Sequence, residues 1–189
     1  DAYEEAHVLG YIRAINSEQY DNLKDEGYSN NDLIGYEGIE KVAERYLRGM
    51  DGKKSIEVDT SGRLTRQQVT VEAIPGNDVV LTLDTNLQKV AFESLAANIE
   101  RIRNIKGDRV NKGDANAGAA VVMDVNTGEI LAMASYPSFD PQLFLAGSED
   151  KAAQKALQEL LSDNVNKPLL NRVIQENYAP GSTFKPLTA

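Results

Sequence analysis

The chain contains no cysteine, and its single histidine is His7. Without cysteine it can form neither disulfides nor thiolate metal sites. One histidine excludes the usual multi-histidine zinc sites, and it leaves a Ser-His-Asp triad only if His7 itself supplies the base. His7 is followed by apolar residues, and a lone histidine in such a context is typically packed or hydrogen-bonded. We therefore expect His7 to be structural and any activated serine to depend on a lysine.

No apolar run approaches the roughly 18 residues that a membrane-spanning helix needs. The formal net charge is −9, from 29 acidic and 20 basic residues, which argues against nucleic acid as a partner. Neither a P-loop nor a G-x-G-x-x-G motif is present, so we expect no cofactor and no metal. The 189 residues are enough for one or two domains with a core. Because the sequence starts at Asp1, we expect a soluble piece of a longer protein.

The first part of the chain predicts short elements. Residues 7–12 favour a strand, and Ser17 is a good N-cap for a helix that Gly27 would end. Residues 35–49 predict one amphipathic helix with an apolar face. That face would consist of Ile39, Val42, Ala43, Tyr46 and Leu47.

From residue 55 the apolar residues recur with period two, on either side of a turn at residues 60–62. This pattern predicts a β-hairpin over residues 55–73. The turn-forming residues 74–77 follow it, and we place a domain boundary there. The prediction is an N-terminal domain over residues 1–75 and a second domain over residues 76–189.

The second part begins with an expected strand at residues 79–83. Thr85 and Gln88 form a capping-box pattern that opens a long helix to residue 106. The apolar residues of this helix are expected to pack on a following sheet: Leu87, Val90, Leu95, Ile99 and Ile102. Residues 107–117 are polar and predict an exposed, mobile loop.

Residues 119–134 predict a hairpin whose first strand is almost entirely apolar and so is expected to be buried on both faces. Ser148 is the expected N-cap of a further amphipathic helix at residues 149–161. We expect the hairpin at 119–134 to have an unpaired edge.

The stretch Ala179–Pro186 is the place where a nucleophile and a potential base occur together. Ser182 and Lys185 are three residues apart, so in a helix starting here they lie on one face. Pro180 and Gly181 prevent a helix from entering from upstream, and Pro186 is tolerated only in a first turn. Ser182 is therefore expected at the helix N-terminus, where free backbone N–H groups can polarise a carbonyl. Lys185 can act as the base only if burial or a positive neighbour disfavours its charge.

Taken alone, S-x-x-K occurs often by chance, and a serine at this position is also a favoured helix N-cap without any catalytic role. The motif is, however, typical of penicillin-binding proteins and class A β-lactamases. The surrounding sequence decides between these interpretations.

Four stretches, in order along the chain, resemble a class B penicillin-binding protein, a monofunctional D,D-transpeptidase. GYEGIEKVAERYLRGMDG at residues 35–52 is similar to the glycine-bounded helix of that family's N-terminal pedestal, and PGNDVVLTLD at 75–84 to the entry of its transpeptidase domain. GAAVVMDVNTGEILAMASYPSFDP at 118–141 resembles the first hairpin of that domain. Asn171-Arg172 followed by YAPGSTFK at 178–185 resembles the approach to the active-site serine.

This resemblance implies that Ser182 is the acylated nucleophile, with its N–H in the oxyanion hole, and that Lys185 is the general base. The implied substrate is the D-Ala-D-Ala end of a peptidoglycan stem peptide, and β-lactams would acylate the same serine. The family's S-x-N and K-T-G motifs follow the active-site serine in the sequence, and neither occurs among the seven residues after Ser182. We therefore expect the 189-residue chain alone to be inactive.

The resemblance also implies a membrane glycan polymerase of the SEDS type as a partner, and a second copy of the chain is a further candidate. The location would be the extracytoplasmic face of the bacterial membrane, with an N-terminal transmembrane anchor outside this sequence. The expected fold class is α+β: a pedestal of short helices and a β-hairpin, then an incomplete α/β/α transpeptidase domain. Two alternatives are kept: a non-catalytic interaction module, and a β-lactam sensor or serine β-lactamase.

Overall fold

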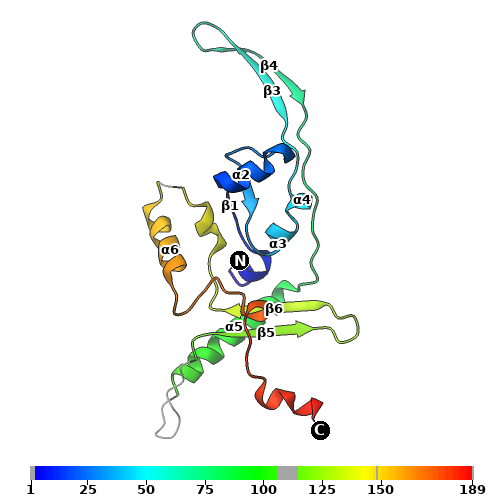
Figure 1. Cartoon of the computed structure of the whole chain (residues 1–189), viewed down its shortest axis with the longest axis vertical. Coiled ribbons are helices and arrows are strands. Elements are labelled where there is room, and N and C mark those ends of the chain that lie inside the picture. The colour runs from blue at the N-terminus through cyan, green and yellow to red at the C-terminus, as the bar shows by residue number, and fades with distance from the viewer. Residues whose placement is uncertain (1–2, 106–114, 148, 189) are drawn as a thin grey trace.

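The computed structural model describes residues 3–105, 115–147 and 149–188, and it has an elongated shape (Figure 1). A β-hairpin projects from one end, and the C-terminal helical turn lies at the other end. Helices and small two-stranded sheets are mixed along the chain, which confirms the α+β class. Within the described residues, no helix is long and apolar enough to cross a membrane.

The first part of the chain folds into short helices around a two-stranded antiparallel sheet. Its elements are α1 (Ala6–Leu9), β1 (Ile12–Ala14), α2 (Ser17–Leu23), the 3-10 helix η1 (Lys24–Glu26), β2 (Leu33–Gly35), α3 (Gly38–Val42) and α4 (Glu44–Leu47). The strand predicted at residues 7–12 is wrong except at Ile12, where β1 begins, because residues 7–9 belong to α1. This helix buries Ala6 and His7, so tertiary contacts override the local strand preference. Asn16, not Ser17, is the N-cap of α2.

The single helix predicted between residues 35 and 49 is also wrong, because it is divided into α3 and α4 at Ala43. Ala43 is buried, whereas Val42 of the expected apolar face is 78% exposed. At the break, Glu44 begins α4 with its carboxylate bonded outside the helix, to the Gly35 N–H at 2.8 Å and the Tyr28 hydroxyl at 2.9 Å. The start of α3 is fixed separately, by a close approach of two backbones at Gly10 and Gly38. A Cβ atom on Gly38 would lie 2.5 Å from the Gly10 nitrogen, and Gly38 has a φ of +62°. The start of α3 is thus positioned by α1 rather than by its own amphipathic pattern.

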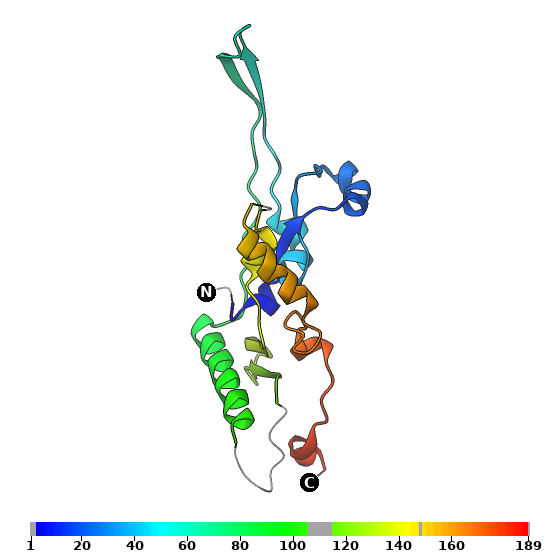
Figure 2. The same cartoon turned by 90° about the vertical axis from the view of Figure 1, so that its left-hand side faces the viewer.

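The predicted hairpin is confirmed as β3 (Lys53–Val58) and β4 (Leu64–Val71), which pair antiparallel. Its turn is held by the Asp59 carboxylate, which accepts hydrogen bonds from the backbone N–H groups of Ser61 and Arg63 at 2.8 and 2.9 Å. Figures 1 and 2 show this hairpin extending away from the body of the molecule. All of its residues are exposed, including those of its apolar face.

The second part contains α5 (Thr85–Arg103), β5 (Gly118–Met123), β6 (Ile130–Tyr136), the 3-10 helix η2 (Pro141–Leu145), α6 (Lys151–Ser162), α7 (Arg172–Gln175) and the 3-10 helix η3 (Gly181–Leu187). The predicted hairpin at 119–134 is confirmed as the antiparallel pair β5–β6. Its first strand is only partly buried, so the prediction of burial on both faces is wrong.

The segment 79–83 forms no strand. Asp150 caps α6, and the predicted cap Ser148 lies outside the described residues, as does most of the predicted mobile loop at 107–117.

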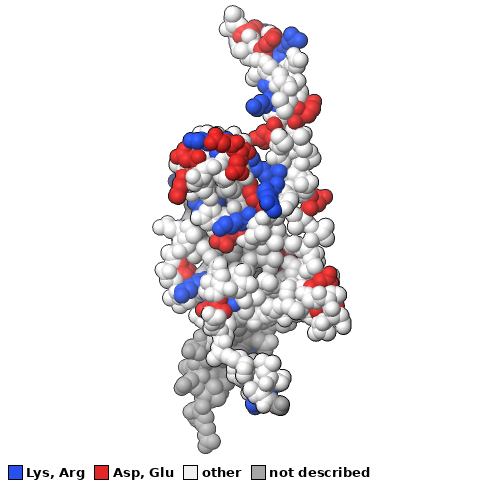
Figure 3. Space-filling view, turned by 45° about the vertical axis from the view of Figure 1, so that its right-hand side comes forward, with Lys and Arg blue, Asp and Glu red and all other residues white. Residues whose placement is uncertain are grey.

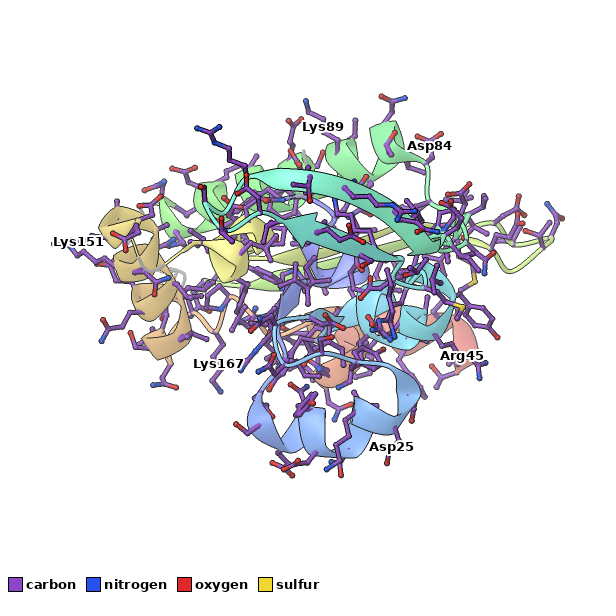
Figure 4. The ribbon with its side chains drawn as sticks, turned by 90° about the horizontal axis from the view of Figure 1, so that it is seen from above. Asp25, Arg45, Asp84, Lys89, Lys151 and Lys167 are labelled. Carbon is purple, nitrogen blue, oxygen red and sulfur yellow. The ribbon has the colours of Figure 1, made fainter. Side chains whose placement is uncertain are left out.

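Helix α5 packs on the β5–β6 hairpin, as predicted, and the predicted residues Leu95 and Ile99 lie against Gly118 of β5, but Val90 and Ile102 do not belong to the buried face. Asp84, labelled in Figure 4, is its N-cap in place of Thr85, and its buried residues are Gln88, Phe92 and Ile99. These residues are four and seven apart and share one side of the helix. Val90 lies about 200° around the helix from Gln88 and is 57% exposed, so its predicted burial is wrong. Ile102 is also exposed, at 37%.

An aromatic core joins the two parts of the chain. Tyr11 of the first part stacks on Phe144, with ring centroids 3.6 Å apart, and meets Phe139 edge to face at 5.9 Å. Tyr36 and Leu169 pack against the same cluster. Leu160 of α6, the helix in front of the first part of the chain in Figure 2, also packs against this cluster. Since aromatic contacts of this kind dominate core energetics, the two parts are expected to fold as one cooperative body.

Charged side chains are unevenly distributed over the surface. On the face shown in Figure 3, both signs of charge gather over the upper half, which contains the short helices and the β3–β4 hairpin, whereas the coloured charges among the described residues are sparser below, apart from an acidic group at the lower right. The charged pairs are mostly exposed; an exception is Arg48 with Asp32, whose closest atoms are 2.8 Å apart. Arg48 also lies 3.5 Å from the ring centre of Tyr28.

Candidate active site around Ser182

Ser182 is the second residue of the 3-10 helix η3 and therefore lies at its N-terminal end, as predicted from the prolines around it. Gly181, directly before it, has a φ of +53°, a conformation that glycine adopts easily. A 3-10 helix has about three residues per turn, so side chains three residues apart are aligned on one face. Ser182 and Lys185 are therefore brought to the same side of η3.

Pro186 explains why η3 is a 3-10 helix rather than an α-helix here. It has no N–H, so the carbonyl of Ser182 four residues earlier cannot accept an α-helical hydrogen bond from it. The helix ends soon afterwards, where the N–H of Thr188 bonds to the Lys185 carbonyl at 3.0 Å. The sequence around the serine thus imposes a short, tightly wound turn.

Both side chains of the Ser182–Lys185 pair are exposed. Among the described residues, no hydrogen bond or ion pair is formed by Ser182 Oγ or by Lys185 Nζ. A serine is a weak nucleophile until a neighbouring base removes its proton, and a lysine base requires desolvation or a nearby positive charge. The described residues place the pair on one face of η3 but do not enclose it.

The segment that leads to η3 is anchored by two adjacent buried residues, Asn171 and Arg172. The Asn171 side chain caps α7 by accepting from the Val173 N–H at 3.3 Å. The backbone N–H of Arg172 donates to Ser135 Oγ at 3.1 Å, and that hydroxyl donates to the Leu170 carbonyl at 3.2 Å. Ser135, which is 2% exposed, thereby fixes the start of α7 to strand β6.

The guanidinium of Arg172 is buried and held mainly by backbone. It donates to the carbonyls of Lys167 and Asn166 at 3.2 and 2.5 Å. Its Nε lies 3.4 Å from Glu176 Oε2, an ion pair whose geometry falls short of a hydrogen bond. Lys167, labelled in Figure 4, has a positive φ of 44°. The sequence indicates Asn171 and Arg172 only through the family resemblance, because no local pattern predicts that these two residues are buried.

Glu176 contacts both Arg172 and Tyr178, and Tyr178 is closer to the serine in the sequence. Its Oε2 accepts a hydrogen bond from the Tyr178 hydroxyl at 2.8 Å. Burial, and then the hydrogen bond to Glu176, raise the pKa of the Tyr178 hydroxyl. Tyr178 is four residues before Ser182.

His7 is buried in α1, and its Nε2 lies 2.8 Å from the carbonyl of Pro168. Since a carbonyl only accepts, Nε2 carries the proton. Burial lowers the pKa of His7, and the charge of Arg172 lowers it further, against the opposing effect of the Pro168 hydrogen bond. His7 is thus a neutral, hydrogen-bonded core residue, in agreement with the structural role expected for it. In Figure 1, α1 and η3 lie well apart along the molecule.

A cavity of about 330 Å³ lies between the first part of the chain and the segment that precedes α7. Its lining includes His7, Tyr11, Glu37, Phe139 and Asn171, and does not include Ser182. Among the described residues, no group of three or more histidine, aspartate or glutamate side chains is arranged to bind a metal ion.

Two family models match the chain. Residues 3–81 match the model described as "Penicillin-binding Protein dimerisation domain", and residues 118–189 match the "Penicillin binding protein transpeptidase domain". The serine motif lies inside the second match. The two matches follow one another in the order that the resemblance implied.

Curated relatives agree over nearly the whole chain. The chain is 38% identical over 184 residues to the peptidoglycan D,D-transpeptidase MrdA of Acinetobacter baumannii, covering 97% of this chain and 24% of that protein. It is 38% identical over 187 residues to MrdA of Escherichia coli K12, covering 97% and 26%, and 36% identical to penicillin-binding protein 3 of Bacillus subtilis, covering 97% and 23%. The chain thus spans about a quarter of the length of these relatives.

The chain is also similar to solved structures over nearly its whole length. One, described as "Structural coordination of polymerization and crosslinking by a peptidoglycan synthase complex", superposes with a TM-score of 0.75 at 42% identity, covering 95% of this chain and 30% of that one. Another, PBP2 of Pseudomonas aeruginosa in complex with WCK 5153, has a TM-score of 0.67 at 35% identity, covering 97% and 32%.

Proposed function

The chain belongs to the class B penicillin-binding proteins, and on that premise we propose that the full-length protein carrying it is a serine D,D-transpeptidase that cross-links peptidoglycan. The observation that carries the proposal is the Ser182–Lys185 pair, aligned on one face of η3 within the segment that matches the transpeptidase domain. The relatives named peptidoglycan D,D-transpeptidases support it.

In the proposed reaction, Lys185 Nζ takes the proton from Ser182 Oγ as the oxygen attacks the D-Ala-D-Ala carbonyl of a stem peptide. The C–N bond to the terminal D-alanine breaks, the amine leaves with a proton, and an ester to Ser182 remains. The amine of a neighbouring stem peptide then attacks the ester, forms the cross-link and frees Ser182. The N–H of Ser182, at the N-terminal end of η3, is suited to bind the oxyanion, because backbone N–H groups there have no helical acceptor.

A β-lactam would react with the same serine: Ser182 Oγ attacks the ring carbonyl, the ring C–N bond opens, and the acyl group stays on the serine. Because the opened ring remains attached, no leaving group departs. This gives the proposal a direct chemical test in β-lactam labelling.

We further propose that residues 1–75 and 76–189 correspond to pedestal and transpeptidase domains. The turn residues at 74–77 support this division, as does the isolated bridge between Met50 and Ile74, which closes the base of the β3–β4 hairpin. The contacts of α1 cross the boundary, so the two domains would be tightly joined. A membrane glycan polymerase is the proposed partner, on the extracytoplasmic side of the membrane; the match to a structure described as a peptidoglycan synthase complex supports it.

The interaction-module alternative rests on one observation, the β3–β4 hairpin. Its apolar face is exposed, with Ile56, Val58 and Leu64 each 57–58% exposed. A binding surface there would be compatible with catalysis elsewhere in the full-length protein. The β-lactamase alternative lacks comparable support, because a free hydrolase has no use for a spacer such as residues 1–75.

The decisive experiment is labelling of the full-length protein with a fluorescent penicillin. We expect stoichiometric labelling of the wild type and none of Ser182→Ala. Ser94→Ala is the matched control, because it removes an exposed hydroxyl from α5, and it should label like the wild type. A wild type that is not labelled would overturn the penicillin-binding proposal. Rapid hydrolysis of the adduct would favour the β-lactamase alternative instead.

A further inference from the structure

The turn that precedes α7 is joined to helix α1 by two reciprocal hydrogen bonds. His7 Nε2 donates to the carbonyl of Pro168 at 2.8 Å, and Asn171 Nδ2 donates to the carbonyl of His7 at 3.0 Å. The second bond joins residues 164 positions apart. Both side chains are at least 91% buried, where an unmade hydrogen bond is costly. We call these two residues the His7–Asn171 pair.

The same turn is held on its other side by β6 and from within by Arg172. Ser135 Oγ contacts both the Leu170 carbonyl and the Arg172 N–H. The Arg172 guanidinium binds the carbonyls of Lys167 and Asn166. The position of this turn is therefore determined by α1 and β6 together, with little freedom left in the turn itself.

Side-chain contacts extend from this turn towards the serine. Arg172 faces Glu176, and Glu176 accepts from the Tyr178 hydroxyl. Between Tyr178 and Ser182 only Ala179, Pro180 and Gly181 remain, and proline restricts the backbone further. Displacement of the turn would thus be transmitted to η3 through a short and constrained segment.

We propose that Asn171 is a positioning residue for Ser182, through which the placement of α1 determines how fast the serine is acylated. The inference rests on the proposed transpeptidase function. Asn171 would touch neither substrate nor nucleophile. Its effect would arise because acylation requires the nucleophile to be placed accurately, and a misplacement of about 1 Å can reduce a rate about 10²-fold.

The two roles of the Asn171 side chain can be separated by substitution. Its Oδ1 caps α7, and its Nδ2 binds the His7 carbonyl. Serine is also a favoured N-cap but is too short to reach His7, so Asn171→Ser keeps the cap and removes the contact with α1. The matched control is Asn16→Ser, the same substitution at the N-cap of α2, where the Asn16 side chain accepts from the Gln19 N–H.

The test uses the full-length protein and a fluorescent penicillin in stopped-flow, which separates non-covalent affinity from the acylation rate constant. For Asn171→Ser we expect the acylation rate constant to fall about 10- to 100-fold, with the affinity changed less than about twofold. Asn16→Ser should leave both unchanged. If Asn171 were merely structural, Asn171→Ser would lower the melting temperature without a fall in the acylation rate constant that exceeds the change in affinity.

His7 provides a second variant that keeps the proposal testable if Asn171→Ser fails to fold. His7→Phe removes the donor to Pro168 and should also slow acylation, whereas His7→Gln, which retains an N–H donor, should recover part of the rate. In the double variant the two losses should be less than additive, because both release the same turn. Wild-type acylation rates in Asn171→Ser, or in His7→Phe should the first not fold, would overturn the inference. An unlabelled wild type would overturn the proposed function instead.

Discussion

Gln88 and Met133 are joined by two hydrogen bonds in which the side-chain amide takes the place of a neighbouring strand. Gln88 Oε1 accepts from the Met133 N–H at 2.7 Å, and Nε2 donates to the Met133 carbonyl at 3.0 Å. The backbone N–H of Asp84 binds the Leu131 carbonyl at 2.9 Å on the same edge of β6. The edge that we expected to be unpaired is therefore covered on the β6 side by the start of α5. Nε2 of Gln88 also reaches the Glu4 carbonyl at 2.6 Å, which ties the N-terminal residues to the same point.

Replacing Gln88 should destabilise the fold strongly. Gln88→Met has a similar shape but leaves the Met133 N–H and two carbonyls without partners in a fully buried site. Each such loss costs about 1–3 kcal/mol, so the three together should lower the free energy of unfolding by about 3 kcal/mol or more. Chemical denaturation followed by circular dichroism measures it. Gln158→Met on the exposed side of α6 is the control and should change stability by less than about 0.5 kcal/mol. Equal stability of the two variants would contradict the role given to Gln88.

Lys185→Ala should abolish labelling of the full-length protein by a fluorescent penicillin, as Ser182→Ala does. The reason is that His7, the sole histidine, is buried in α1 and bonded to Pro168, so it cannot replace the lysine as base. Lys155→Ala removes an exposed lysine from α6 and should label normally. Labelling is measured by in-gel fluorescence. Full labelling of Lys185→Ala would show that another group takes the proton.

The 189-residue chain by itself should not be acylated at a useful rate. Ser182 and Lys185 are exposed on a short 3-10 helix, and neither S-x-N nor K-T-G occurs among the seven residues after Ser182. Loss of one oxyanion donor alone typically costs about 10²- to 10³-fold in rate. Intact-mass spectrometry after incubation with a β-lactam is the measurement. Stoichiometric acylation of this chain would disprove the prediction.

The stability of the fold should fall as the pH is lowered through the ordinary pKa of histidine. Burial lowers the pKa of His7 in the folded state, so below about pH 6.5 the unfolded state binds more protons than the folded state. The free energy of unfolding should therefore decrease from about pH 7 downwards and level off below the folded pKa of His7. Because His7 is the sole histidine, the difference between the wild type and His7→Gln isolates this contribution. Denaturation between pH 5 and 8 measures it, and parallel pH profiles would contradict the prediction.

Gly38→Ala should disrupt the contact between α1 and α3. The added Cβ would lie 2.5 Å from the Gly10 nitrogen, and the residue has a positive φ. Gly62→Ala in the β3–β4 turn provides the control, since its φ of +76° is also positive but nothing lies within 4 Å of the added atom. Gly62→Ala should lower the free energy of unfolding by about 1–2 kcal/mol through backbone strain alone. Gly38→Ala should lower stability clearly more than Gly62→Ala, as measured by thermal denaturation. Similar losses of stability in the two variants would show that the close approach is easily relieved.

The local sequence was sufficient for elements whose cause is local. Period-two apolar residues around Asp59 and Gly62 predict the β3–β4 hairpin, and an apolar run followed by a turn predicts β5–β6. The three-residue spacing between Ser182 and Lys185, with Pro186 after it, was enough to align the pair on one face of a helical turn. These features depend on residues only a few positions apart.

The remaining features were decided by contacts between distant residues, which no local pattern records. Residues 7–12 favour a strand, but burial of Ala6 and His7 against residues near Phe139 makes the first of them helical. The helix that its periodicity predicted to be continuous is divided at Ala43, where the Glu44 carboxylate bonds to the Gly35 N–H and the Tyr28 hydroxyl. The sequence pattern places Gln88 in a capping box near the surface, yet its buried side chain forms hydrogen bonds with the backbone at the edge of β6. In each case the free energy of burying a group and satisfying its hydrogen bonds exceeds the small local preference, and that energy depends on the tertiary structure alone.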